Sequence, residues 1–313
     1  CDQHKITGQI SMPKPEEVKD VIEHYLSTFP KRKKEVQVGF FGGNFTGIPI
    51  DEQEAYLSIA HEYLIQGKID GIRLSTRPDY INEQIIKLLK KYKVSTVELG
   101  AQSMVDEVLV KSKRGHSAAD TVRAAELIKN AHIRLGLQMM IGLPGDAPEY
   151  DLQTARAFVD LEADDTRIYP TLVIKGTALE AMYQKGTFRV LTMEEAVDRT
   201  AEVYKIFEQA GIRIIRVGLH PSEGLTEGSD MVAGPFHKSF RELVLTRLWG
   251  EELSPLIKAS DKRKIVIIVP EGQINFAIGY AAKNKKALLQ FYDNVVFLRD
   301  NTLKNREYDV NYH

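Results

Sequence analysis

Cysteine, long apolar runs and an excess of charge of one sign are all scarce in this sequence. A single cysteine among 313 residues excludes an internal disulfide framework and fits a reducing compartment. The longest apolar run, Ile265 to Val269, is far shorter than the roughly 20 residues of a membrane span. Lys plus Arg (42) nearly equal Asp plus Glu (43), so any polyanionic partner must be met by a local patch. We therefore expect a cytoplasmic protein with no secretory leader and no membrane partner.

The one cysteine, Cys1, is also the first residue. Judged from its position alone, it fits an arbitrary edge of a longer chain, the first residue of a processed bacterial lipoprotein, or an amino-terminal nucleophile. Position does not separate these three interpretations, so the rest of the sequence has to decide.

Short β-rich runs alternate with amphipathic segments through much of the chain. The runs predicted as strands are Val36–Phe41, Gly71–Ser75, Thr96–Gly100, Leu135–Met140, Thr166–Leu172 and Ile212–Val217. The segments predicted as helices include Asp51–Gln66, Asn82–Tyr92, Ala118–Asn130 and Glu194–Gln209. Strand–helix alternation at intervals of roughly 25–45 residues is typical of βαβ units around a parallel sheet or barrel. The predicted fold class is α/β.

Two of the predicted helices are preceded by a capping signal. Ser117 precedes Asp120, and Thr192 precedes Glu195, at the spacing of a capping box. Because a hydroxyl and a carboxylate at this spacing satisfy free amide groups of the first turn, both pairs predict helix starts.

After about Gly218 the alternation lapses, so we divide the chain into a core, residues 1–218, and a C-terminal part, residues 219–313. The stretch Leu219–Pro235 shows no clear periodicity and is interpreted as a long functional loop. Beyond it the sequence predicts a helix, a strand, a second helix and a last strand, which are Lys238–Leu248, Lys264–Val269, Asn275–Gln290 and Asn294–Leu298. We interpret these elements as a small appended α/β unit.

Glycines and polar side chains gather where the predicted strands end. In chain order the ends read FFGGNFTG (40–47), STRPDY (75–80), ELGAQS (98–103), QMMIGLPG (138–145) and YPTL (169–172). In a parallel α/β barrel, catalytic and binding residues collect where the strands end. Five consecutive ends of this composition therefore predict an enclosed small-molecule site.

Six motifs in unbroken order resemble those of the radical S-adenosylmethionine (SAM) superfamily. They are FFGGNF, STRPDY, VELGAQS, KRGH, IGLPGD and IYPTLVIKGT, within a match that spans about Cys1 to Val217. The chain is most similar to the radical domain of the Elongator catalytic subunit and its bacterial relatives, and also resembles oxygen-independent coproporphyrinogen oxidase. The resemblance implies a partial (β/α)6 TIM-like barrel, with the first strand missing from these residues, and a small C-terminal α/β extension.

The resemblance also gives Cys1 a role. In that superfamily three cysteines with the spacing CxxxCxxC follow the first barrel strand and hold a 4Fe-4S cluster, and Cys1 resembles the third of them. The other two are absent from these 313 residues, and one thiolate does not replace three. We therefore expect two further cysteines upstream, and no activity from this chain without them.

The resemblance further implies where SAM binds. Gly42 and Gly43 would present backbone carbonyls to its amino group. Arg114 matches the position that pairs with its carboxylate, where a charge-assisted contact is expected. Ser75 and Gln138 stand where relatives often carry acidic ribose contacts, and either side chain still hydrogen-bonds hydroxyl groups. The cofactor-binding residues implied in this way are Gly42, Gly43, Asn44, Ser75, Gln102, Arg114 and Gln138.

The substrate side is implied with less detail. The candidate substrate contacts are Tyr169, Lys175, Thr177 and His220. Ordinary surface positions remain an alternative for all of them. For Arg114 the alternatives are a helix cap and an ion pair with Glu98.

Two functions are compatible with these residues. The first is an enzyme that uses a 4Fe-4S cluster to cleave SAM reductively and abstracts hydrogen from a substrate, with RNA as a candidate and flavodoxin or ferredoxin as electron donor. The second is a cluster-less barrel that binds nucleotide or RNA as a module. No acetyl-coenzyme A loop is recognised after Val217, so acetyl transfer is not implied. We expect Leu219–Pro235 and the appended unit to close over the barrel as a lid, because a radical must be shielded from water; a linker to a stabilising unit is the alternative.

Overall fold

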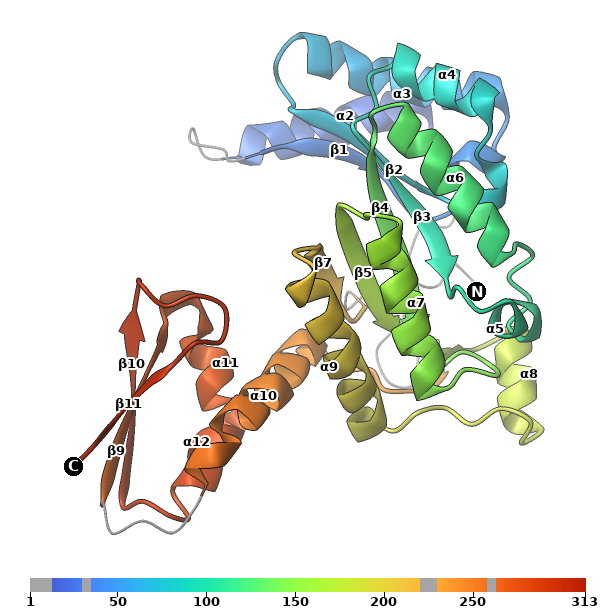
Figure 1. The fold of residues 1–313 in the computed structure, drawn as a ribbon. Coiled ribbons are helices and arrows are strands. Elements are labelled where there is room, and N and C mark those ends of the chain that lie inside the picture. The colour runs from blue at the N-terminus through green and yellow to red at the C-terminus, as the bar shows by residue number, and fades with distance from the viewer. Residues whose placement is uncertain (1–12, 30–34, 220–229, 258–262) are drawn as a thin grey trace.

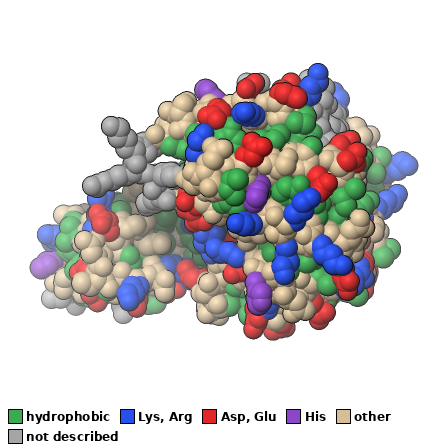
Figure 2. All heavy atoms as spheres, turned by 90° about the horizontal axis from the view of Figure 1, so that it is seen from above, with side chains coloured by type: hydrophobic (Ala, Val, Ile, Leu, Met, Phe, Trp, Pro, Cys, Tyr) green, Lys and Arg blue, Asp and Glu red, His purple; other side chains and the backbone are tan. Residues whose placement is uncertain are grey.

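The computed structural model describes residues 13–29, 35–219, 230–257 and 263–313. They form a larger α/β body and a smaller C-terminal unit, joined by the helix α10 (Phe240–Leu253) (Figure 1). Basic and acidic side chains are interspersed over the face seen in Figure 2, in agreement with a net charge of -1. Within the described ranges, no helix is both long enough and apolar enough to cross a membrane.

A sheet of six parallel strands organises the larger body. In spatial order these are β1 (Gln37–Phe40), β2 (Gly71–Thr76), β3 (Thr96–Gln102), β4 (Arg134–Ile141), β5 (Asp165–Pro170) and β7 (Arg213–Val217). Every neighbouring pair runs parallel. All six predicted strands are present, and the α/β class is confirmed.

Helices pack on the outer face of the sheet because the side chains that point outward are apolar. Leu74, Val97, Leu137 and Ile168, from four neighbouring strands, are fully buried in one hydrophobic core. The helices of this body are α2 (Pro15–Thr28), α3 (Ile50–Ile65), α4 (Glu83–Lys91), α5 (Asp106–Lys111), α6 (Ala118–Asn130), α7 (Pro148–Asp160), α8 (Ala178–Gln184) and α9 (Met193–Gln209).

The sheet is curled into half a barrel. Arg73 Nη2 on β2 donates to Asp165 Oδ1 on β5 at 2.5 Å, although two strands lie between them. In a flat sheet, strands three places apart are separated by about 14 Å, so this contact across the inner face requires curvature. The partial TIM-like barrel with a C-terminal extension is therefore confirmed.

Both predicted capping boxes are formed. Ser117 Oγ accepts from Asp120 N at 3.2 Å, and the Asp120 carboxylate accepts from Ser117 N at 2.8 Å. Thr192 Oγ1 accepts from Glu195 N at 3.2 Å, and the Glu195 carboxylate accepts from Thr192 N at 2.8 Å. Helices α6 and α9 therefore begin within one residue of their predicted starts.

The helix α10 takes part in two hydrophobic cores. Phe240 and Leu248 pack in the core of the larger body, whereas Trp249 and Leu253 pack in the core of the C-terminal unit. The sheet of that unit has the order β10 (Asn294–Asp300), β9 (Lys264–Pro270), β11 (Asp309–Tyr312). The division of the chain at residue 218 stays a prediction.

Two elements of the C-terminal unit differ from the sequence interpretation. The single helix expected around Asn275–Gln290 is two short helices, α11 (Ile274–Ile278) and α12 (Lys283–Leu288). They are separated because Gly279 has a φ of 87° and two residues after it, Ala281 and Ala282, also have positive φ. The strand predicted at Asn294–Leu298 is not the last, since β11 follows and pairs antiparallel with β9.

The segment expected to be one long loop contains a short strand. β8 (Met231–Ala233) pairs antiparallel with β6 (Val173–Ile174), which follows β5. Residues 220–229 lie outside the described residues.

The C-terminal unit contacts the larger body through α10, which packs on α9 and β7. It lies beside these elements and not over the carboxyl ends of the other strands (Figure 1). The expectation that the appended unit closes the barrel as a lid is therefore wrong. The physical reason is that its apolar side chains pack around α10, which runs away from the sheet.

Candidate active site

The carboxyl ends of β1 to β4 meet at one edge of the half-barrel, and the predicted cofactor residues lie there. Residues 42–44 follow β1, Ser75 is the penultimate residue of β2, and Gln102 is the last residue of β3. Gln138 lies within β4, and Arg114 is in the connection between α5 and α6 that follows β3. Parallel strands bring these distant positions together, as in other parallel barrels.

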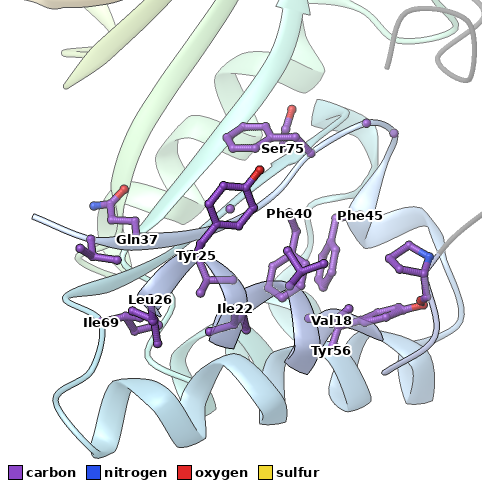
Figure 3. A pocket seen from close by; sticks show the side chains of 18 of the residues that line it. Val18, Ile22, Tyr25, Leu26, Gln37, Phe40, Phe45, Tyr56, Ile69 and Ser75 are labelled. Carbon is purple, nitrogen blue, oxygen red and sulfur yellow. The ribbon is translucent and has the colours of Figure 1, made fainter. Parts of the chain in front are cut away.

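A cavity of about 530 Å³ lies between α2 and β1. Figure 3 shows side chains of α2, such as Tyr25, facing Phe40 and Phe45 across it. Its size is within the usual range for small-molecule sites. Four of the predicted cofactor residues line it, namely Gly42, Gly43, Asn44 and Ser75. The other three do not line this cavity, since Gln102 ends β3, Gln138 lies within β4 and Arg114 lies in the connection that follows β3.

The glycine turn after β1 is anchored and open on one side. Gly42 has a φ of 104°, a conformation that favours glycine. A Cβ on Gly43 would meet no atom within 4 Å, so its backbone borders open space. Asn44 Oδ1 accepts from Thr76 Oγ1 at 2.5 Å and from Arg77 N at 3.1 Å. These hydrogen bonds fix the turn to the end of β2. The space next to the Gly43 backbone stays open because glycine has no side chain to fill it.

Two amide side chains connect β3 and β4. Gln138 Nε2 donates to Gln102 Oε1 at 3.2 Å. Gln102 is 4% exposed and has a φ of 67°, which is unusual for a residue other than glycine. The register of β3 against β4 also shifts between Leu99 and Gln102. Strained backbone and irregular register at a strand end are features that cluster at ligand sites.

Arg114 is half-buried near a second arginine, Arg77, and the Nε atom of its guanidinium is fully buried. Its Nε has no hydrogen-bond partner among the described residues. Burial, together with the charge of Arg77, lowers the pKa of Arg114. Arg77 is itself engaged, since it donates to both carboxylate oxygens of Asp79 at 3.0 and 2.8 Å. A half-buried cation with a buried, unused donor fits the carboxylate of a ligand such as SAM.

The alternative pairing of Arg114 with Glu98 is wrong. Glu98 Oε2 instead accepts from Arg167 Nε at 2.7 Å and lies 3.5 Å from Arg73 Nη2. The reason is the orientation of β3, which turns Glu98 toward the inner face of the half-barrel while Arg114 lies beyond the strand end.

A buried ion cluster holds the loop that follows β4. Asp146 Oδ2 accepts from Gly142 N at 2.7 Å and from Arg199 Nη2 at 2.8 Å. Arg199 Nε donates to Asp151 Oδ2 at 2.5 Å. Burial and the neighbouring Asp146 raise the pKa of Asp151 to about 8. Sequence reasoning missed this cluster because Arg199 is 48 and 53 residues away from its two partners.

The inner face near β5 and β7 carries arginines that sequence reasoning also missed. Arg73 and Arg213 donate to Asp165 at 2.5 and 3.2 Å, and Arg167 pairs with Glu98. Burial raises the pKa of Glu98, and the charges of Arg167 and Arg73 oppose that rise. A partial signal was present, because Arg73 stands between Ile72 and Leu74 in β2. Asp165 and Arg167 are two residues apart in β5, and both spacings are typical of strands with one polar face.

The predicted substrate-side residues have different surroundings. Tyr169 is half-buried on the inner face, and its hydroxyl accepts from Arg167 Nη1 at 3.3 Å. Thr177 caps α8, since its Oγ1 accepts from Glu180 N at 3.3 Å. Lys175 is exposed after β6. His220 lies outside the described residues.

A site for a complete iron–sulfur cluster is not formed by these 313 residues. They include one cysteine, Cys1, which lies outside the described residues. Within the described ranges, no three His, Cys, Asp or Glu side chains are grouped so that they could hold a metal ion. The arrangement at β1 to β4 therefore fits the small-molecule cofactor, whereas the cluster needs thiolates that this sequence does not contain.

The half-barrel and its strand-end site agree with comparisons of the sequence. The radical SAM superfamily matches residues 1–158, and the radical SAM C-terminal domain matches residues 163–249. The chain belongs to the radical SAM superfamily of enzymes. Within it, the chain is close to the Elongator catalytic subunit.

Three relatives show this similarity. The tRNA uridine(34) acetyltransferase of Methanocaldococcus infernus is 38% identical over 128 residues, which are 40% of this chain and 24% of the relative. Elongator complex protein 3 of Saccharomyces cerevisiae is 29% identical over 241 residues, 73% of this chain and 41% of the relative. The solved structure of Elp3 from Methanocaldococcus infernus, with an N-terminal deletion, has a TM-score of 0.66 and 26% identity, covering 76% of this chain and 59% of that chain. This chain therefore spans between about a quarter and three fifths of these relatives' own length.

Proposed function

We propose that this protein is a radical SAM enzyme that binds SAM at the carboxyl ends of β1 to β4 and abstracts hydrogen from an RNA substrate. The observation that carries the proposal is the half-buried Arg114, whose Nε is buried and has no described partner, at the strand edge that presents the open turn Gly42–Gly43. A carboxylate would satisfy this guanidinium, and a hydrogen bond to a charged group contributes about 1.5–3 kcal/mol.

The other strand-end residues have complementary roles in the proposal. The carbonyls of the glycine turn, which Asn44 anchors, accept from the amino group of SAM. Ser75, Gln102 and Gln138 bond its ribose hydroxyls or its methionine portion. The apolar side chains of α2 around the cavity exclude water from the reacting atoms.

The proposal includes a 4Fe-4S cluster with Cys1 as one of three thiolate ligands. When bound, such a cluster supplies the electron for reductive cleavage of SAM to methionine and a 5′-deoxyadenosyl radical. A flavodoxin or ferredoxin is the proposed electron donor, and the cytoplasm is the proposed compartment.

The names of the relatives support RNA as the substrate, because one is a tRNA uridine(34) acetyltransferase. In the proposal the substrate enters beside β5 and contacts Tyr169, Lys175, Thr177 and His220. Residues 1–218 perform the radical chemistry, and residues 219–313 form a separate C-terminal part. Acetyl transfer is not included, since no acetyl-coenzyme A loop is recognised after Val217.

Anaerobic reconstitution of the full-length protein with iron and sulfide tests the proposal. We expect a brown protein that absorbs near the blue end of the spectrum and releases 5′-deoxyadenosine from SAM when reduced. Cys1→Ala is the control and should prevent cluster assembly. A colourless parent protein with intact cysteines that still binds RNA would instead support a cluster-less binding module.

A further inference from the structure

The inner face at β5 and β7 carries more positive than negative charge. Three arginines pair there with two buried carboxylates: Arg73, Arg167, Arg213, Glu98 and Asp165. A fourth arginine, Arg216, is half-buried and makes no ion pair among the described residues. Register pairs Arg216 with Arg167 on the neighbouring strand, so both side chains start on the same face of the sheet. Arg216 therefore adds a positive charge to this face that no described carboxylate neutralises.

The contacts of Tyr169 show that the positive charge lies near the carboxyl end of β5, where Tyr169 is the penultimate residue. Its hydroxyl accepts from Arg167 Nη1 at 3.3 Å. Burial raises the pKa of Tyr169, and the charges of Arg167 and Arg216 oppose that rise. Arg216 is paired in register with Arg167, and Arg167 is hydrogen-bonded to Tyr169, so the three residues lie at neighbouring positions near the end of the sheet where ligands bind.

Phe41 contacts Arg167 from the opposite edge of the sheet, because it follows β1 whereas Arg167 is on β5. It follows β1 and is 46% exposed, with the Arg167 guanidinium carbon 4.8 Å from the centre of its ring. An arginine over an aromatic face is a favourable cation–π contact. Phe41 also lines the cavity that includes the glycine turn. It therefore lies between the proposed SAM site and the arginines.

We infer that Arg216 and Phe41 form a subsite for one nucleotide of single-stranded RNA, in which Arg216 binds a phosphate and Phe41 stacks on the base. The inference rests on the proposed function for the class of substrate. Guanidinium groups match phosphate oxygens in a bidentate manner, and unpaired RNA bases are recognised by stacking on aromatic rings. Arg167 is a positioning residue, because Glu98 already holds it while it supports the Phe41 ring.

Fluorescence anisotropy with a labelled, uridine-rich single-stranded RNA tests the subsite in the full-length protein. Loss of one phosphate contact reduces the salt dependence, the slope of log affinity against log salt, by about 0.7. Arg216→Gln should therefore bind roughly tenfold more weakly and with this smaller slope. Arg216→Lys should restore the slope. Arg213→Gln, on the same strand, is the matched control and should retain affinity and slope.

Phe41 is tested by the same titration. Phe41→Ala should weaken binding about tenfold, because a stacked base is lost, but it should leave the slope unchanged since no charge is removed. Phe41→Tyr keeps the ring and should bind like the parent protein.

Three results would overturn the subsite: a parent protein that does not bind the RNA, an Arg216→Gln protein with the parent slope and affinity, or equal losses in Arg216→Gln and Arg213→Gln. Calorimetry with SAM on the reconstituted proteins separates this inference from the proposed function. Absent SAM binding with the expected RNA results would contradict the proposed function alone. Normal SAM binding with RNA affinity unaffected by Arg216→Gln would contradict the subsite alone.

Discussion

The half-barrel contains two buried ion clusters with opposite imbalances of charge. Beside the loop after β4, Asp146 and Asp151 share the guanidinium of Arg199. On the inner face, arginines outnumber the carboxylates Glu98 and Asp165. An excess of carboxylate is relieved by protonation, and the pKa of Asp151 is raised to about 8. An excess of arginine is not relieved in this way, because guanidinium groups stay charged.

This difference separates a cluster that holds a loop from one at which we propose that a ligand binds. In the carboxylate-rich cluster, the two aspartates accept hydrogen bonds from Arg199, and Asp146 also accepts one from the backbone N–H of Gly142. In the arginine-rich cluster, Arg216 makes no ion pair with a described carboxylate, and we propose that it binds an RNA phosphate. Burial of charge alone therefore does not mark a binding site, and the proposed subsite depends instead on Arg216, which has no ion pair among the described residues.

Removal of Asp165 should give the largest effect on the inner cluster. Asp165 is 0% exposed, and its loss removes the only ion pair that Arg213 makes among the described residues. The same loss leaves Arg73 with Glu98 alone, at 3.5 Å. Breaking a buried ion pair in this way costs about 3–5 kcal/mol, so Asp165→Ala should lower the free energy of unfolding in urea by that amount. Asp160→Ala, an exposed residue that ends α7, is the control and should change it by less than about 0.5 kcal/mol. Equal values for the two variants would show that the cluster does not stabilise the fold.

The next largest effect is expected at the proposed SAM site, where Arg114 is a further arginine without an ion pair among the described residues. Arg114→Ala removes a half-buried guanidinium whose Nε is a buried, unused donor, so SAM affinity should fall about tenfold or more, which corresponds to about 1.5–3 kcal/mol. Titration calorimetry on the reconstituted protein measures this. Arg123→Ala, an exposed arginine on α6, should bind SAM normally. Unchanged affinity in Arg114→Ala would remove Arg114 from the site.

The carboxylate-rich cluster should make stability depend on pH. The pKa of Asp151 is about 8 in the folded protein and 3.8 as the ordinary value, so the folded state retains a proton that the unfolded state releases. The stability of the parent protein relative to Asp151→Asn should be greatest below about pH 4 and should decrease as the pH rises through about 8, by at most about 1.4 kcal/mol per pH unit. Urea unfolding across this window measures it. A constant difference would mean that Asp151 stays ionised beside Arg199.

The smallest effect is local and involves neither cluster. Ser117→Ala removes the N-cap of α6, which begins just after Arg114, and should cost about 1 kcal/mol of unfolding free energy. Ser117→Thr keeps the hydroxyl and should cost less. If Ser117→Ala also weakened SAM binding as much as Arg114→Ala does, the separation between local capping and the proposed binding contact would fail.

Most of the secondary structure could be predicted from the sequence. The six parallel strands and the starts of α6 and α9 depend on side-chain periodicity and on capping groups within a few residues of each other. The superfamily was recognisable for a similar reason, since its motifs are short continuous stretches at the ends of strands. These features need no information about distant parts of the chain.

Tertiary structure alone decided which charges meet. Arg73 and Asp165 are 92 residues apart in sequence, and they pair because the sheet curls. The break at Gly279 also depends on a distant element, since a Cβ there would lie 2.9 Å from the Thr246 side chain of α10. The C-terminal unit lies beside β7 because α10 contributes apolar residues to both cores. Periodicity shows which face of an element is buried, but the partner across that face is selected by packing and by the low dielectric of the interior, which act through space and not along the chain.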